Sequence, residues 1–103
     1  MELKKALGMA LRRARKSRQL SQEDFTGVSS QTYLSLLEVG AKGPTIEKLD
    51  AIASAMGVHP LTILTDCYLL VDESLTLDEL FSRIRTELSQ REDHSKPSAQ
   101  SSA

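Results

Sequence analysis

Cysteine and aromatic residues are scarce in this chain of 103 residues, which has one Cys, two Tyr, two Phe and no Trp. A single cysteine cannot form an internal disulfide, so we expect the chain to fold in a reducing cytoplasm. Hydrophobic residues make up 40% of the chain, enough for a small core built mainly from aliphatic side chains and methionine. The length predicts one domain, with at most an appendage.

Long apolar runs are also missing. No run approaches the ~20 residues that a membrane span requires, and we expect no membrane partner. The first residues do not resemble a signal peptide, because Lys4, Lys5 and Gly8 interrupt their apolar stretch. Gly8 should also weaken the first helix, since glycine lowers helix propensity by roughly 1 kcal/mol relative to alanine.

The sequence has no motif that is typical of an enzyme: no Gly-rich phosphate loop, no paired catalytic carboxylates and no nucleophile elbow. His59, His94 and Cys67 lack the spacing of metal ligands, so we expect neither a metal nor a cofactor. We interpret Cys67 as a small buried hydrophobic residue, with a redox-sensing role as the alternative.

Charge is balanced over the whole chain but divided along it. Residues 1–20 hold seven basic groups and one acid, whereas residues 66–93 hold eight acids and three basic groups. Such a chain can place a basic face on phosphate while its acidic end points away. The alternative is that both runs are solvated helix faces, as most charge runs are.

The segment 21–40 predicts two short helices separated by a tight turn. Ser21 can cap the first helix, and Ser30 can cap a second that extends over about 31–39. Gly40 is well placed to end this second helix. Two helices joined by so short a turn form a helix-turn-helix, whose second helix lies in the DNA major groove.

Helical periodicity predicts further helices on both sides of this unit. The helix over 45–56 should bury an apolar stripe that begins at Ile46. A run that starts with Pro60 at a first helical position is strongly apolar, and its end over 66–71 permits either helix or strand. The remaining predicted helices cover 3–18 and 76–92. Thr45 and Thr76 are the expected N-caps of the helices over 45–56 and 76–92. The expected domains are a helix-turn-helix domain over 1–70, a C-terminal extension helix over 71–93 and a disordered tail over 94–103.

Five short motifs follow one another along the chain at particular spacings. They are Leu11-Arg12…Arg15, Leu20-Ser21-Gln22-Glu23, Tyr33-Leu34-Ser35…Leu37-Glu38…Gly40, Pro44-Thr45…Leu49 and Met56-Gly57-Val58…Leu64. In this order they resemble the lambda-repressor-like, or XRE, family of bacterial and phage regulators. The resemblance implies an all-α fold, a five-helix lambda-repressor-like DNA-binding domain, here with an additional C-terminal amphipathic helix. The stretch between Phe25 and Tyr33 is about two residues shorter than is usual in the family, so the end of the second helix or the turn must be abbreviated.

The resemblance also implies how double-stranded DNA would be bound. The expected base contacts come from the start of the second helix, where Gln can bind adenine and a Thr methyl can pack on thymine. Leu36 could contact a thymine methyl or could belong to the core. The predicted base contacts are Gln31, Thr32, Ser35 and Leu36; the predicted phosphate contacts are Gln22, Lys42, Arg12, Arg13, Lys16 and Arg18. Relatives pair an arginine of the first helix with a glutamate of the recognition helix, here Arg15 and Glu38, as structural support.

The helix over 76–92 is the expected oligomerisation element, because its apolar stripe is not needed to close the five-helix core. The alternative is that it folds back onto its own domain. The stripe consists of Leu77, Leu80, Phe81, Ile84 and Leu88.

The expected function is a cytoplasmic, nucleoid-associated and sequence-specific transcriptional regulator, a repressor that binds DNA as a homodimer or higher oligomer. The alternatives are an antitoxin with the same DNA-binding domain, whose C-terminal helix binds a protein partner, and an interaction adaptor that does not bind DNA.

Overall fold

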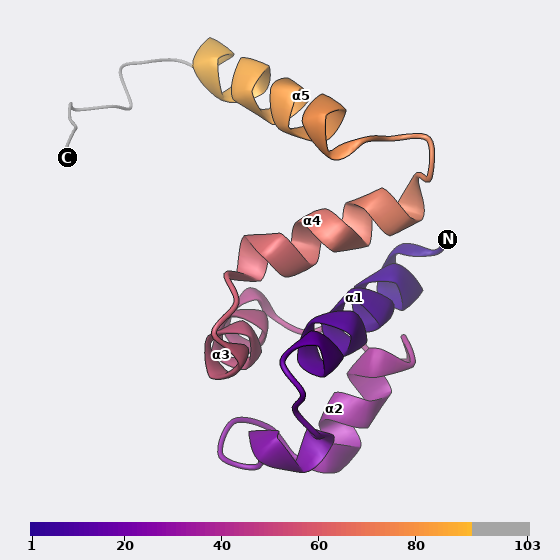
Figure 1. Ribbon diagram of the computed structural model, residues 1–103, viewed down its shortest axis with the longest axis vertical. Helices are drawn as coiled ribbons and strands as arrows, with labels where there is room; N and C mark the ends of the chain where they lie inside the picture. The colour runs from indigo at the N-terminus through magenta and orange to yellow at the C-terminus, as the bar shows by residue number, and fades with distance from the viewer. Residues whose placement is uncertain (92–103) are drawn as a thin grey trace, which may run out of the picture.

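The computed structural model describes residues 1–91, and over that range the chain is helical without strands (Figure 1). This confirms the all-α prediction. The elements are α1 (Leu3–Ser17), the 3₁₀ turn η1 (Gln22–Phe25), α2 (Gln31–Glu38), α3 (Ile46–Met56), α4 (Pro60–Val71) and α5 (Leu77–Gln90). The tail predicted over 94–103 lies outside the described residues.

The helix boundaries are set by the capping residues that the sequence predicts. The side chains of Ser30, Thr45 and Thr76 each accept a hydrogen bond from the backbone N–H three residues on, at 3.0, 3.0 and 3.1 Å. Pro60 begins α4, where its missing N–H costs no hydrogen bond. Gly40 has φ +81° directly after the C-cap of α2, a backbone conformation that favours glycine.

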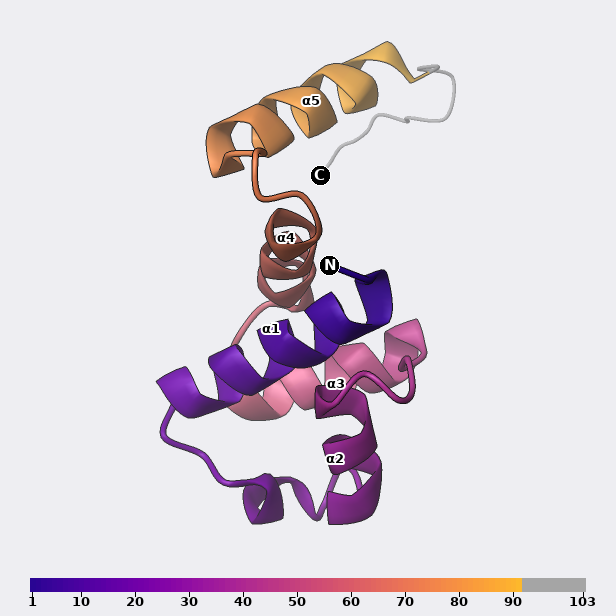
Figure 2. The ribbon, with the colours of Figure 1, turned by 90° about the vertical axis from the view of Figure 1, so that its right-hand side faces the viewer.

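The core lies between α1, α2, α3 and α4 and includes Phe25 of η1. α1 lies against α2 on one side and against α4 on the other, as the two ribbon views show (Figures 1 and 2). None of the core residues within 1–91 comes from α5. The buried apolar residues are Ala6, Ala10, Leu11, Phe25, Leu34, Leu37, Leu49, Ile52, Ala53, Met56, Ile63 and Cys67.

The first helix of the predicted helix-turn-helix is reduced to the single 3₁₀ turn η1 of four residues. The prediction of an α-helix after Ser21 is therefore wrong in type, although the expected shortening is confirmed. The Ser21 N–H donates to the Asp24 carboxylate at 2.7 Å, which satisfies a free donor at the start of this turn. The chain then turns through Gly27 and the buried Ser29 into α2.

One other prediction needs correction. Ile46 was expected to begin the buried stripe of α3, but it is the first residue of that helix and is 81% exposed. Gly8, which was expected to weaken the first helix, lies within α1, and that helix is continuous from Leu3. A Cβ atom at Gly8 would lie 2.4 Å from the Leu37 carbonyl oxygen, so the glycine permits α1 and α2 to approach closely. Residues 66–71, for which the sequence permitted helix or strand, are helical and form the end of α4.

α5 stands apart from the four-helix core, beyond α4 (Figure 2). Its residues are exposed or half-buried, and none of them is fully buried. Within residues 1–91 no single helix is long and apolar enough to cross a bilayer; α3 and α4 reach that length only as a pair bent by 107°.

Candidate nucleic-acid interface

All four predicted base-contact residues of α2 keep exposed surface. Leu34 and Leu37 of the same helix point inward and are completely buried in the core. At about 100° per residue, Thr32 and Leu36 face away from the core, whereas Gln31 and Ser35 lie on one flank of the helix. Gln31 and Thr32, in the first turn, are exposed, and Ser35 and Leu36 are partly exposed.

Leu36 was expected either to touch DNA or to belong to the core. It lies outside the buried cluster and keeps part of its surface exposed. The short turn before α2 therefore does not rotate Leu36 into the interior. Its side chain lies one turn after Thr32, on the same strip of the helix surface.

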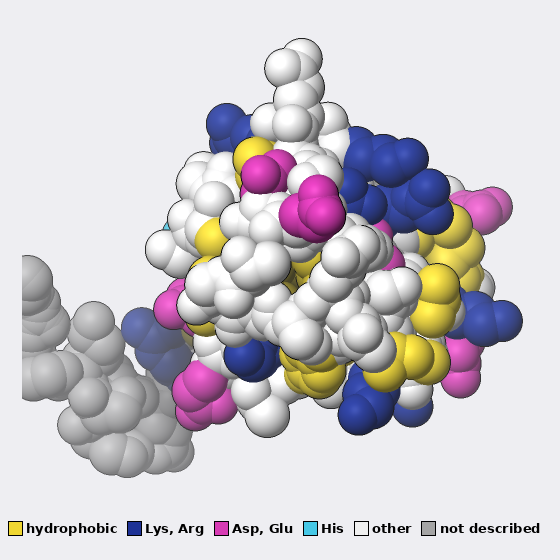
Figure 3. Space-filling view, turned by 90° about the horizontal axis from the view of Figure 1, so that it is seen from below, with side chains coloured by type: hydrophobic (Ala, Val, Ile, Leu, Met, Phe, Trp, Pro, Cys, Tyr) yellow, Lys and Arg dark blue, Asp and Glu magenta, His cyan; other side chains and the backbone are white. Residues whose placement is uncertain are grey.

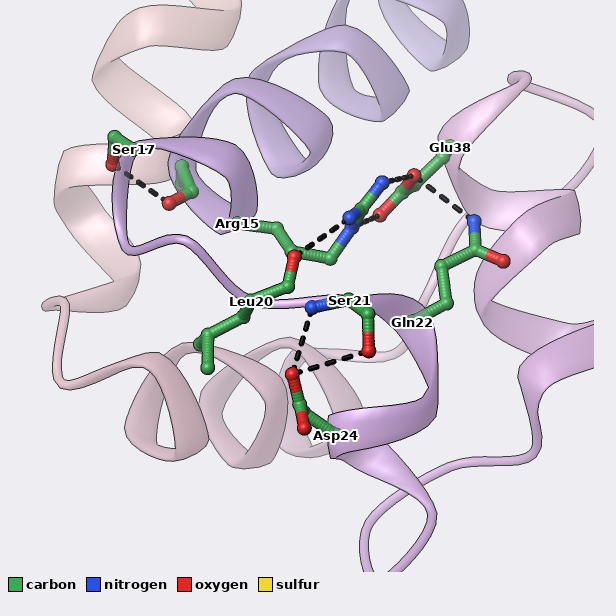
Figure 4. Close-up of polar contacts among 8 residues, drawn as sticks. Arg15, Ser17, Leu20, Ser21, Gln22, Asp24 and Glu38 are labelled. Carbon is green, nitrogen blue, oxygen red and sulfur yellow. Dashed lines mark hydrogen bonds and ion pairs between the residues drawn. The ribbon is translucent and has the colours of Figure 1, made fainter.

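A buried ion pair fixes the end of α2 to α1 (Figure 4). The Arg15 guanidinium donates from Nε to Oε2 of Glu38 at 2.7 Å and from a terminal nitrogen to Oε1 at 2.9 Å. A third donor of Arg15 binds the Leu20 carbonyl at 2.8 Å. Hydrogen bonding to Glu38 raises the pKa of Arg15 above its ordinary value, against the effect of burial. The geometry is that expected of a strong, bidentate Arg–carboxylate pair.

Gln22 extends this network from η1. Its Nε2 donates to Oε1 of Glu38 at 3.1 Å, so the same carboxylate receives bonds from α1 and from η1 (Figure 4). One side of α2 is thereby held by both preceding elements. Gln22 remains partly exposed at the edge of the face that α2 presents.

The predicted phosphate contacts separate into two groups. Arg12, Lys16 and Lys42 are exposed and form no ion pair within residues 1–91. Arg13 and Arg18 instead face the α4 side of α1: Arg13 pairs with Asp66 at 3.3 Å, and Arg18 donates to the carbonyl of Gly57 at 3.3 Å. The structure does not bring these two arginines beside α2.

The structure adds two residues to the region beside α2 that sequence reasoning missed. Lys48, in the first turn of α3, donates from Nζ to the carbonyl of Val28 at 2.9 Å. Its Nζ lies 5.7 Å from the centre of the Tyr33 ring, and Nζ of Lys42 lies 5.9 Å from the same ring. The sequence gives no signal for this cluster, because only the packing of α3 beside α2 brings Lys48 to Tyr33.

The face that carries η1 and the beginning of α2 shows mostly uncharged side chains and backbone at its centre, with some carboxylates and hydrophobic side chains among them (Figure 3). Lys and Arg side chains gather around its rim, together with a few carboxylates. Uncharged polar groups at the centre can read base edges, and cations at the rim can bind phosphates.

Cys67 and His59 belong to no metal site within residues 1–91, where no group of three His, Cys, Asp or Glu residues could bind an ion. His94 lies outside the described residues. Burial and the neighbouring Asp66 raise the pKa of the Cys67 thiol. The thiol is thus less reactive than an exposed cysteine, in agreement with the buried hydrophobic role predicted for it. The ring Nδ1 of His59 accepts the Leu61 N–H at 3.0 Å and caps α4.

Comparison with known proteins shows to which family this chain belongs. A model of the helix-turn-helix family matches residues 11–63, from the middle of α1 into α4. The chain belongs to this helix-turn-helix family of the XRE type. It is 37% identical over 67 residues to an uncharacterized HTH-type transcriptional regulator, y4dJ, of Sinorhizobium fredii (strain NBRC 101917 / NGR234). That match covers 63% of this chain and 87% of the relative.

Among solved structures, this protein resembles ClgR, the clp gene regulator from Corynebacterium glutamicum, with a TM-score of 0.63 and 25% sequence identity. The match covers 94% of this chain and 97% of ClgR. The uncovered share of this chain is smaller than α5, so the likeness extends beyond the family core into that helix. Together these findings identify a DNA-binding transcriptional regulator.

Proposed function

We propose that this regulator represses transcription by binding a specific DNA sequence as a homodimer in the cytoplasm. The observation that supports base recognition most directly is the first turn of α2, where the side chains of Gln31 and Thr32 are both exposed. Gln can form two hydrogen bonds with adenine, and Thr can pack its methyl group on thymine. The N-terminal residues of a recognition helix are those that reach base edges in helix-turn-helix complexes.

Repression is the simplest function for a small domain of this kind. Blocking RNA polymerase requires only that the protein occupies its DNA site, whereas activation requires a surface that recruits polymerase. The helices α1 to α4, including the proposed recognition helix α2, share one small core. We therefore propose that the protein controls transcription by occupying its DNA site.

α5 supports the proposal of a dimer. Its apolar stripe is 40–53% exposed at Leu77, Phe81, Ile84 and Leu88. A single helix of this length is marginal in water unless its apolar face is covered. A groove between α4 and α5, lined by Leu61, Leu64, Tyr68, Leu80 and Ile84 among others, continues the same apolar surface.

The charges of α5 favour an antiparallel arrangement of two copies. Arg83 and Glu87 pair with each other at 2.9 Å within the helix, which leaves Asp78 and Arg85 available to a partner. When Leu77 of one copy packs against Leu88 of the other, Asp78 lies beside Arg85 of the second copy, twice by symmetry. In a parallel pair Asp78 and Arg85 would not face each other, because they lie on the same flank of α5 and opposite flanks meet in that arrangement.

Fluorescence anisotropy against the protein's own upstream DNA and a scrambled duplex, over a salt series, tests DNA binding. The logarithm of affinity should fall linearly with the logarithm of salt concentration, by about 0.9 per phosphate contacted. A preference for the upstream DNA would indicate autoregulation, and equal binding would place the operator elsewhere. Absence of binding to both at low salt would contradict the proposal and favour a protein-interaction adaptor.

Sedimentation of a chain that ends at residue 75 tests the dimer. The truncated chain should sediment as a monomer at concentrations at which the full chain sediments as a dimer. If the truncated chain keeps the assembly state of the full chain, the interface lies outside α5.

A further inference from the structure

We propose that a pocket between α1 and α4 binds a small organic carboxylate. The pocket is lined by the second half of α1, the loop before α4 and the first turns of α4, and none of its lining residues belongs to α2. α1 and α4 lie side by side in opposite directions, so that Arg18 reaches Gly57 and Arg13 reaches Asp66 (Figure 1). The site goes beyond the proposed binding of DNA, and it gives a role to two arginines that do not lie beside α2.

The pocket has the size of a small-molecule site. Its volume is about 570 Å³, within the ~300–1,000 Å³ of typical ligand pockets. Apolar side chains line its inner part: Ala10 and Ile63 are almost completely buried, whereas Ala14 and Val58 keep part of their surface exposed. A short hydrocarbon body can therefore pack against this surface and be removed from water.

The two arginines supply the pocket with hydrogen-bond donors. The Arg13 guanidinium pairs through Nε with the Asp66 carboxylate at 3.3 Å, and Arg18 donates through one terminal nitrogen to the Gly57 carbonyl at 3.3 Å. The other nitrogens of both guanidinium groups form no hydrogen bond within residues 1–91. Because a guanidinium presents its donors in a planar fork that fits a carboxylate, these unused donors favour an anionic ligand.

His59 adds a further donor at the same pocket. Its Nδ1 accepts the Leu61 N–H at 3.0 Å, so this nitrogen carries no proton, and the neutral ring has its N–H at Nε2. The same residue is the N-cap of α4, and the N-terminal end of a helix carries a partial positive charge. Both features favour an anion, as the two arginines do.

The charge of the pocket indicates which kind of anion it fits. Arg13 and Arg18 contribute two positive charges, Asp66 contributes one negative charge, and the neutral His59 contributes none, which leaves a balance of +1. A carboxylate carries one negative charge and matches this balance, whereas a phosphate monoester carries close to two at pH 7. The pocket therefore favours a carboxylate that is attached to a short apolar body.

Titration of the full, isotope-labelled chain with hexanoate at constant ionic strength tests the site through backbone amide resonances. Hexanoate combines a carboxylate with a short apolar chain, whereas acetate lacks the chain and hexanol lacks the charge. The resonances of Gly57, Val58 and Thr62 should shift and saturate with hexanoate, with a dissociation constant on the order of 1 mM. Acetate and hexanol should bind at least about tenfold more weakly, because each provides only one of the two contacts.

Variants show whether the arginines hold the carboxylate. Arg18→Gln keeps a long polar side chain and should weaken hexanoate binding about tenfold, the effect of losing one charge-assisted hydrogen bond. Arg13→Gln should weaken binding at least as much, because Asp66 then lies unpaired beside the charge of the ligand. Lys4→Gln is the matched control: it removes one positive charge from the other end of α1 and should leave hexanoate binding unchanged.

Three results would overturn the proposal. They are the absence of saturable shifts with hexanoate, equal affinity for hexanoate and for either acetate or hexanol, and unchanged hexanoate affinity in both arginine variants. The titration contains no DNA, so none of these results affects the proposed function. Absence of DNA binding in the anisotropy experiment would likewise leave the carboxylate site in place.

Discussion

At the scale of single residues, the candidate interface depends on a few buried groups that lie behind the exposed residues of α2. Glu38 receives bonds from both Arg15 and Gln22, and so joins three elements at one carboxylate. Gly8 has the complementary role, because it removes the side chain that would separate α1 from the end of α2. These residues set where the exposed residues of α2 lie.

Arg15→Ala should lower the free energy of unfolding by ~3–5 kcal/mol, because it leaves the Glu38 carboxylate buried without its main partner. Arg18→Ala is the matched control: its bond to the Gly57 carbonyl is long and exposed, and its loss should cost less than ~1 kcal/mol. Urea unfolding of the two variants checks the difference. Equal midpoints would contradict the structural role assigned to Arg15.

Gly8→Ala should destabilise the fold by ~1–3 kcal/mol through overpacking, although alanine by itself favours a helix by roughly 1 kcal/mol. The added Cβ atom would lie 2.4 Å from the Leu37 carbonyl oxygen and 2.6 Å from that of Glu38. Gly27→Ala places its Cβ where nothing lies within 4 Å and should leave stability within ~0.5 kcal/mol. A thermal melt that shows Gly8→Ala to be the more stable of the two would exclude the close approach.

At the scale of elements, local signals in the sequence predict most of the boundaries. Ser30, Thr45, Thr76 and Pro60 begin helices as expected, because capping depends only on near neighbours. The 3₁₀ form of η1 was not predicted in type, since it results from fitting a shortened segment between α1 and α2. Ile46 was wrongly expected to be buried, because helical periodicity alone does not show at which end an apolar stripe extends beyond the core.

α5 contributes no residue to the buried core within residues 1–91. Its charged residues allow a test of the proposed antiparallel dimer. Asp78→Arg and Arg85→Asp should each raise the dimer dissociation constant on the order of tenfold, because two symmetry-related attractions become repulsions. An equimolar mixture of the two variants should form a heterodimer, in which opposite charges again face each other. Analytical ultracentrifugation measures both effects.

If the mixture of α5 variants associates no better than either variant alone, the antiparallel pairing is wrong. Ser82→Arg changes charge on the same helix away from the apolar stripe and controls for a general effect of charge. Its dissociation constant should stay close to that of the unmodified protein.

At the scale of the whole molecule, the fold and the position of α2, the candidate recognition helix, were predictable from the sequence, whereas the residues that surround α2 were not. The order of the motifs from Leu11 to Leu64 indicates the family, and membership of the family implies the fold. Which basic residues lie beside α2 depends on tertiary packing: Arg13 and Arg18 face α4, whereas Lys48 reaches Tyr33 from α3. Spacing along the chain contains no information about such contacts.

The central claim is that the first turn of α2 reads base edges. The most direct test is to select a binding site from random duplexes and to compare it with a scrambled duplex at one salt concentration. With Gln31 and Thr32 both replaced by Ala, affinity for the selected site should fall by ~1–3 kcal/mol for each lost base contact. Affinity for the scrambled duplex should not change, and Gln90→Ala should alter neither. Equal losses on both duplexes, or no loss on the selected site, would contradict the claim.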